Sequence, residues 1–556
     1  MHLKALIFCA FFCSATSLFG QDLSQISKQK PVNVDGSIAA TSNFYSINGK
    51  ESGRDPFSYI LSGNVNVSIY GLQLPFSFMY SNSSFSYAQP LNRFGISPEY
   101  KWIKLHIGYR SITFSPLTLA GHSFLGAGIE LTPGKFRFGA AYGRFNKKTI
   151  PNTNNPLDTL QTPTRKGFSM KIGVGTPKNY FDLIMLKIAD DTLSFDKTKY
   201  GSKIPQSNTV LGTHMKFTLF KNLTWETEGA ISLLTKNISS GEPFNIENAF
   251  LQNLANVVNV NSTSEYTTAL TSVLTYSFRG YSLGLQYRRI DPNYQSFGAY
   301  YFNTDMENIT MNLKAGLFKN KLSISGNIGL QNDNIRNNKA SESSRVISMA
   351  NLAYNSGKKF SINGSFSNYS INQQPGRLPL NDTIKLYQSN RNITLTPTLA
   401  FNNAKAQQMI QLNLALMDLI DHNPYTKATS EVTSQMAMLN YFINHLKSGL
   451  SVMTGLNYNT MSSVYSSQTM FGVNADVGKT FWKGKLSGHL TIASNRSNMN
   501  DVLGWVHTGS LSATYKPHPK HLFKLNFNRV QNQYPGNSSV KSFSETKLML
   551  SYVFRF

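Results

Sequence analysis

The chain has 556 residues, with 53 Lys and Arg against 28 Asp and Glu, so its formal net charge is +25 at pH 7. Only 15% of its residues are charged, below the roughly 25% of soluble proteins, and no segment beyond residue 20 approaches the roughly 18 unbroken apolar residues of a spanning helix. The basic residues are dispersed instead of forming one patch interleaved with stacking aromatics, which argues against nucleic-acid binding.

The first 20 residues have the pattern of a secretory signal peptide. His2 and Lys4 precede an apolar stretch over residues 5–12, and small and polar residues follow. The only cysteines, Cys9 and Cys13, lie inside this segment and lack the small-residue motif of a lipoprotein. We therefore expect export to the periplasm, a short periplasmic segment over residues 21–32, and a mature chain without disulfides or thiol chemistry.

From residue 33 onward, apolar and polar residues alternate in one run after another. Clear examples are Phe57–Tyr70, Leu223–Leu233 and Leu322–Gln331. Side chains alternate faces along a strand, so each run predicts a strand with one apolar face. About 26 such runs of roughly 10–14 residues occur, near the length of a tilted membrane-spanning strand.

The connections between the runs alternate between tight and long. Pro133-Gly134 and Arg279-Gly280 are tight, whereas Asn146–Arg165 and Asn237–Glu265 are long. This rhythm predicts one all-β domain over residues 33–556: a transmembrane antiparallel up-and-down barrel of about 26 strands (24–26), with short periplasmic turns and longer extracellular loops. Pro75 predicts a bulge or local distortion in its strand. A soluble array of β-sandwiches is disfavoured because no boundary divides the chain into units of about 100 residues.

The sequence ends with an alternating strand over Lys547–Phe556. The last three residues on one face of this strand are aromatic: Tyr552, Phe554 and Phe556. This ending resembles the closing strand of bacterial outer-membrane barrels, where the last aromatic residues are part of the assembly signal. With F-G-A-Y-Y-F-N303 and L-A-G-H-S-F-L-G-A-G128, the chain resembles large, porin-like outer-membrane barrels of Bacteroidota. The resemblance implies outer-membrane lipids and the barrel-assembly machinery as partners. The 11 residues before Val32 leave no room for the plug domain of TonB-dependent transporters.

The basic residues form two groups. Lysines at the tight turns, such as Lys101 and Lys221, either mark the headgroup level or dock a periplasmic partner. The second group lies on the polar strand faces, where few acids, chiefly Glu130, Glu226 and Glu228, oppose it. Either this group makes the lumen attractive to anions, or it is ordinary lumen polarity that loops neutralise. Its members are Arg110, Arg137, Lys171, Lys216, Arg288, Lys314, Lys524, Lys547 and Arg555.

Catalytic and metal signals are weak. His106 and His214 face inward by parity but lie in no recognisable nucleophile motif, and the pair His518 and His521 lacks further ligands. The sequence therefore predicts no enzyme activity, no cofactor and no metal site.

A barrel of about 26 strands encloses a wide lumen, which two loops could close. Asp291–Asn303 is rich in aromatics, and Ile246–Val260 has apolar residues near helical spacing. Either these loops fold inward or a separate protein blocks the lumen. We expect a porin-like or partner-gated transport channel with a basic lumen. The alternative is a non-transporting barrel that anchors a secretion, assembly or adhesion complex.

Overall fold

A computed structural model describes residues 32–82, 93–149, 163–194, 204–240, 260–357, 359–377, 380–381, 383, 385–536 and 538–556. The predicted signal peptide lies outside these ranges. So does the candidate helix of residues 246–260, apart from its last residue. Both stay predictions.

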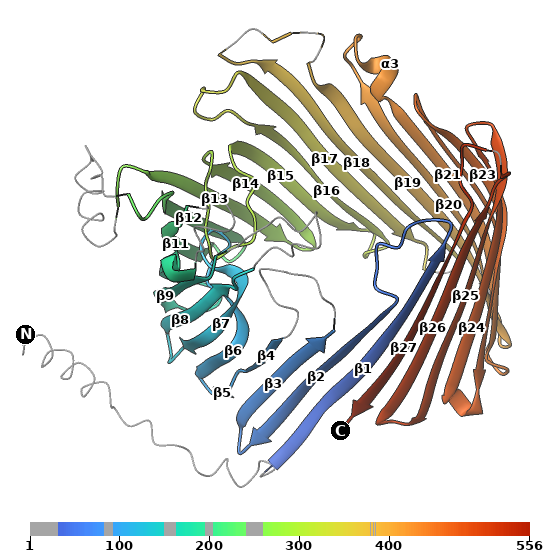
Figure 1. Ribbon diagram of the computed structural model, residues 1–556, viewed down its shortest axis with the longest axis horizontal. Coiled ribbons are helices and arrows are strands. Elements are labelled where there is room, and N and C mark those ends of the chain that lie inside the picture. The colour runs from blue at the N-terminus through green and yellow to red at the C-terminus, as the bar shows by residue number, and fades with distance from the viewer. Residues whose placement is uncertain are drawn as a thin grey trace, which may run out of the picture.

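The described residues form one antiparallel barrel (Figure 1). Twenty-seven strand segments follow one another, and each pairs with its neighbours in the chain; β4 and β5 are two parts of one strand, which gives 26 strands. The last strand pairs with the first, from Ser37 opposite Arg555 to Asn48 opposite Ser544, so the barrel is closed. The fold class and the strand number predicted from the sequence are confirmed.

The strands are β1 (Val32–Asn48), β2 (Phe57–Ile69), β3 (Leu72–Ser81), β4 (Arg93–Ile96), β5 (Glu99–Tyr100), β6 (Ile103–Thr113), β7 (Ala120–Leu131), β8 (Phe136–Asn146), β9 (Arg165–Gly175), β10 (Tyr180–Asp190), β11 (Ser207–Leu219), β12 (Leu223–Thr235), β13 (Ser264–Phe278), β14 (Tyr281–Ile290), β15 (Met306–Leu317), β16 (Leu322–Asn332), β17 (Ser341–Asn355), β18 (Phe360–Pro375), β19 (Tyr387–Asn402), β20 (Ala406–Asp421), β21 (Val432–His445), β22 (Leu450–Ser463), β23 (Ser467–Phe481), β24 (Leu486–Met499), β25 (Val502–His518), β26 (His521–Gln533) and β27 (Phe543–Arg555). Short helical turns are η2 (Thr192–Ser194), α3 (Lys427–Ser430) and η3 (Trp482–Gly484). Among the described residues, no helix is long and apolar enough to cross a membrane.

The two faces of the strands differ in the way a membrane requires. In β10, Leu183 is 47% exposed on one face, while the neighbouring Ile184 is 3% exposed on the other. Aliphatic and aromatic side chains on the outward positions of β13 and β14, such as Leu274 and Leu285, are similarly exposed. Hydrocarbon lipid covers such an outer face, and the closed ladder leaves no unpaired edge in it, so the barrel spans the membrane.

The connections alternate as expected. One end of the barrel carries the tight turns, together with the start of β1 and the end of β27; we call it the short-turn end. At one of its turns Phe220 and Lys221 have φ of 50° and 62°, the left-handed conformation of primed hairpin turns.

Pro75 causes less distortion in its own strand than the sequence predicted. The pairing of β3 with β2 runs through Asn66 opposite Pro75 without a register shift. The irregularity lies in the next strand, which is interrupted at Ser97-Pro98 between β4 and β5. β3 therefore has no bulge, but the alternative of a local distortion is confirmed, because the ladder from β3 to β4 and β5 is interrupted at Leu74 and Pro75, opposite Ser97-Pro98.

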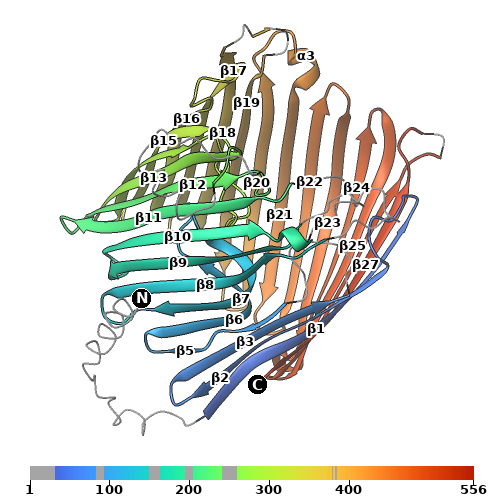
Figure 2. The same cartoon turned by 60° about the vertical axis from the view of Figure 1, so that its left-hand side comes forward.

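The barrel has two unlike halves (Figure 2). Strands β6 to β12 have 11 to 13 residues, whereas β17 to β20 have 15 or 16 and β25 has 17. We call β6–β15 the first half and β16–β27 the second half; β1–β5 lie between β27 and β6 and belong to neither.

Candidate functional site inside the barrel

Two loops fold onto the inner face of the first half. One is Phe114–Leu119, between β6 and β7, and the other is Asp291–Asp305, between β14 and β15; together we call them the inner lobe. Their apolar side chains join one buried cluster with inward side chains such as Leu186 of β10 and Val210 of β11. All members of this cluster come from residues 112–306.

The two loops of the inner lobe are fastened to each other. The Tyr294 hydroxyl donates to the Leu117 carbonyl at 2.6 Å, and the Ala120 N–H donates to the Gly298 carbonyl at 2.9 Å. Tyr294 is 0% exposed, and burial raises the pKa of its hydroxyl well above the usual value. The hydroxyl therefore stays protonated and keeps donating throughout the physiological pH range.

Polar groups of the wall hold the inner lobe in place. The Glu228 carboxylate of β12 accepts from the Leu117 N–H. The Asn208 side chain of β11 accepts from the Phe297 N–H at 3.0 Å and donates to the Gln295 carbonyl at 3.3 Å. A buried carboxylate and a buried amide that are satisfied by loop backbone fix one conformation, because an unpaired polar group there is costly.

The barrel wall has glycine at two inward positions that the inner lobe contacts. A Cβ atom at Gly139 would lie 2.6 Å from the Phe114 ring, and one at Gly212 would lie 2.5 Å from Cγ2 of Thr118. Glycine at these two inward positions therefore makes room for the lobe side chains.

Of the alternatives for Asp291–Asn303, the structure shows the inward-packed one for Tyr294 and Phe297, whereas Tyr301 is exposed. The sequence analysis did not predict that Phe114–Leu119, the other loop of the inner lobe, folds inward. The available signal was the sequence F-S-P-L-T-L119, in which Phe114, Leu117 and Leu119 are apolar although they lie between two strands.

Several of the predicted lumen bases are paired with acids. Arg137 makes a bidentate ion pair with Asp182, with both N···O distances 2.7 Å. Lys216 lies 2.9 Å from Glu226, and Lys547 lies 2.8 Å from Glu545. Lys171 lies under the inner lobe, with its Nζ 5.0 Å from the centroid of the Phe114 ring. The sequence reading missed Asp182 as a lumen acid because, together with Lys187, it obscured the alternation of β10.

The remaining five basic residues of the predicted lumen group have other surroundings. Arg110 donates to the Ser77 hydroxyl at 2.5 Å and to the Pro75 carbonyl at 3.3 Å, and Arg288 lies near Glu228. For Lys314, Lys524 and Arg555 the described part of the chain supplies no ion pair. The structure thus does not gather the nine residues into one site.

Ser97, His106 and Glu130 form a hydrogen-bonded row. The Ser97 hydroxyl lies 3.2 Å from His106 Nδ1, and His106 Nε2 lies 2.9 Å from Glu130. The row has the residue types of a nucleophile, a base and an orienting acid. However, the Ser97 N–H donates to the Pro75 carbonyl and residue 98 is proline, so the nucleophile position and the residue after it supply no N–H for an oxyanion. The row joins the interrupted strand to β6 and β7.

The other candidate histidines are also satisfied locally. His214 Nε2 lies 3.1 Å from Glu226 and 3.2 Å from the Tyr180 hydroxyl. His521 Nδ1 lies 2.8 Å from the Tyr552 hydroxyl, next to His518. Of the predicted terminal signal, Tyr552 and Phe554 lie in β27, and Phe556 exchanges two backbone hydrogen bonds of 3.2 Å with Gly36. Whether these three aromatics direct assembly remains a prediction.

The inner face of the second half has a different chemistry; we call it the open wall. Positions that alternate with the lipid-facing residues are repeatedly asparagine, and the side chains of Asn440 and Asn474 lean over Gly455 between them. Neighbouring strands add further amides at Asn327, Asn351, Asn363, Asn413, Asn457, Asn495 and Asn526. Side-chain amides offer both donors and acceptors without net charge.

A closed barrel with an apolar outer face and a hydrogen-bonding inner face defines a membrane-spanning β-barrel protein. No family model matches the chain, and a comparison with curated proteins found no match.

Solved structures that resemble the chain include the translocation pore of the P pilus usher PapC, with 11% identity, a TM-score of 0.38, and coverage of 94% of this chain and 99% of that chain. The FrpB iron transporter from Neisseria meningitidis has 9% identity, a TM-score of 0.38, and coverage of 96% and 83%. OccAB2 from Acinetobacter baumannii has 8% identity, a TM-score of 0.30, and coverage of 64% and 92%. At these TM-scores the likenesses carry no argument about function.

Proposed function

We propose that this protein is an outer-membrane transport channel whose lumen is narrowed by the inner lobe. The observation that carries the proposal is the division of the inner surface: the inner lobe covers the first half, while the buried cluster that holds it includes no residue of the open wall. A barrel of this size that only anchored a complex would not need an ordered internal obstruction next to an amide-lined face.

The chemistry of the open wall favours polar solutes. Amide and hydroxyl groups can replace the hydrogen bonds that a hydrated solute gives up at the wall, at little cost in desolvation. Because several lumen bases are paired with acids, we propose only a modest preference for anions, carried by Lys314, Lys524 and Arg555. Export through a signal peptide and insertion by the barrel-assembly machinery complete this proposal.

The test is single-channel conductance of the purified barrel in planar bilayers, with anionic and cationic solutes of matched size. We expect steady, reproducible openings that are smaller than those of an unobstructed barrel of this strand number, and a weak anion preference. A protein that never conducts until a stoichiometric partner is removed would instead support the partner-gated version. A protein that conducts under no condition would support the anchoring alternative.

A further inference from the structure

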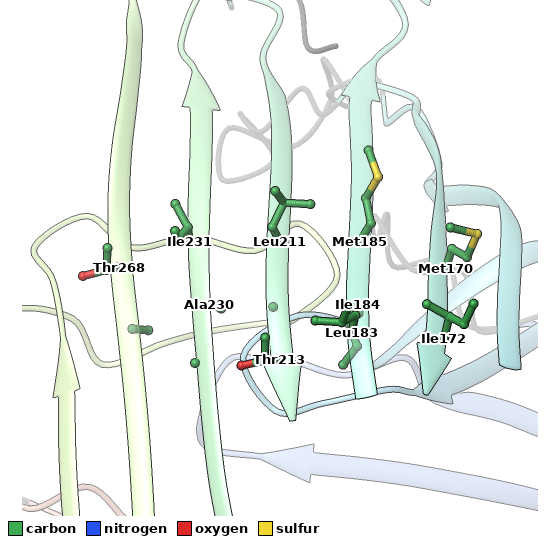
Figure 3. A pocket seen from close by; sticks show the side chains of 13 residues that line it. Met170, Ile172, Leu183, Ile184, Met185, Leu211, Thr213, Ala230, Ile231 and Thr268 are labelled. Carbon is green, nitrogen blue, oxygen red and sulfur yellow. The ribbon is translucent and has the colours of Figure 1, made fainter. Parts of the chain in front are cut away.

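A hollow lies on the outer face of β9–β13 and has a volume of about 560 Å³. Its walls are apolar and come from adjacent strands, as Figure 3 shows for Met170, Met185 and Leu211. In β10, Leu183 and Met185 line the hollow from the outer face. Ile184 between them also borders the hollow, although it belongs with Leu186 to the buried cluster beneath the inner lobe. Because neighbouring residues point to opposite faces, the hollow opens toward the membrane.

The hollow exists because its floor is made of small residues. Thr213 of β11 lies opposite Gly229 of β12, and Thr268 of β13 lies beside them. A Cβ atom at Gly229 would meet nothing nearer than Leu270 Cδ1 at 3.7 Å and Thr213 Oγ1 at 3.8 Å, which are ordinary contacts. Neither packing nor a left-handed backbone requires glycine here, so its effect is to leave space that a larger side chain would fill.

We propose that this hollow is a binding site for one acyl chain of a phospholipid. The surrounding solvent at this depth is hydrocarbon, and the volume falls within the range of about 300–1,000 Å³ that is typical of single-ligand sites. The proposal is independent of the proposed transport function, because it concerns the opposite face of the wall.

The choice of a phospholipid follows from charge and depth. The turns at the short-turn end directly below the hollow carry exposed lysines, Lys178 between β9 and β10 and Lys221 between β11 and β12. Leu183 is five residues from Lys178, about 17 Å along an extended strand and about 13 Å in depth for a strand tilted by about 40°. Half of the hydrocarbon core is about 15 Å. A lipid whose phosphate meets these ammonium groups would therefore place the end of its acyl chain in the hollow.

The test is native mass spectrometry of the protein purified from membranes and washed stepwise with mild detergent. We expect the wild-type protein to retain one phospholipid after the bulk lipid is gone. Gly229→Leu should lower the retained fraction by about fivefold or more, because the new side chain occupies the space of the chain. The matched control is Gly364→Leu in β18, which also lies opposite an outward residue and whose Cβ would lie 3.6 Å from Leu395 Cδ1, outside the hollow.

The control variant should retain the lipid as the wild type does. Thr213→Leu fills the same hollow from the neighbouring strand and replaces Gly229→Leu if that variant does not fold. Equal retention in the wild type and both filling variants would overturn the proposal. So would a wild type that retains no lipid, or one that retains lipopolysaccharide in place of phospholipid.

Discussion

The two halves of this barrel line its lumen in different ways. The first half uses mostly short strands, inward glycines and an apolar lobe, and several of its inward charges are paired, as in Arg137 with Asp182. The second half uses longer strands and has asparagine at many positions of its inner face. The comparison teaches that a large lumen can be narrowed from one side while the opposite side is left as a polar passage. The first three predictions below each change one half and use the other as the control.

The largest effect is expected from removing half of the inner lobe. Replacement of residues 292–304 by a four-residue Gly-Ser linker joins Ile290 and Met306, the adjacent ends of β14 and β15. We expect single-channel conductance to rise by about twofold or more, because a major obstruction leaves the lumen. Burial of Tyr294 is also lost, and truncating a fully buried aromatic residue costs about 3–5 kcal/mol of stability.

The control for this deletion shortens a loop of the second half. Replacement of residues 422–431, which connect β20 and β21, by the same linker should leave conductance within about 20% of wild type, because that loop contributes nothing to the buried cluster. An equal rise in both variants would show that loop length in general, and not the inner lobe, sets the conductance.

The next effect comes from breaking a buried ion pair. The Asp182 side chain is 1% exposed, so Asp182→Asn leaves the Arg137 guanidinium uncompensated and should cost about 3 kcal/mol. The matched pair in the second half is Arg391 with Asp418, at 3.4 Å and with Arg391 46% exposed; Asp418→Asn should cost less than about 1 kcal/mol. Urea unfolding in lipid vesicles measures both, and similar costs would remove the distinction between the halves.

A smaller effect is expected on ion selectivity. A unit charge about 6 Å from the ion path in water is worth about 0.7 kcal/mol, and salt with a Debye length of about 8 Å reduces this by about half. The anion loses this energy and the cation gains it, so Lys524→Gln should lower the anion-to-cation permeability ratio by about threefold. The double variant Lys216→Met with Glu226→Gln removes a paired base and acid together and should leave the ratio unchanged. Reversal potentials in a salt gradient measure the ratio. An unchanged ratio in Lys524→Gln would exclude this lysine from the ion path.

The smallest effect is a loosening of the inner lobe in acid. Burial alone would raise the pKa of Asp305, but the Lys339 ammonium and the N–H groups of Ile335 and Asn334 outweigh it and hold this pKa below its usual value. The stabilisation is therefore complete above the usual pKa of aspartate and is lost as the pH falls through the lowered one. Conductance should rise slightly in that acidic window, and Asp305→Asn should remove the rise. A rise of the same size in the variant would assign it to another group.

Much of the fold could be predicted from the sequence, but little of the site could. Alternation is local, so Leu322–Gln331 reveals its strand without knowledge of any neighbour, and the last strand is visible in Lys547–Phe556. The inner lobe depends on contacts between distant residues: Leu117 meets Glu228 111 positions away, and Ser296 meets Thr118 178 positions away. Such pairings follow from barrel closure and register, which period-two patterns do not encode.

The most direct test of the central claim is thiol accessibility within the conducting pore. The predicted mature chain has no cysteine, so single cysteines can be placed at Asn474 on the open wall and at Val210, which is 0% exposed beneath the inner lobe. We predict that a charged, membrane-impermeant methanethiosulfonate reagent changes the current rapidly in Asn474→Cys and leaves Val210→Cys unchanged. Equal modification of the two cysteines, or faster modification of Val210→Cys, would contradict a channel that runs along the second half.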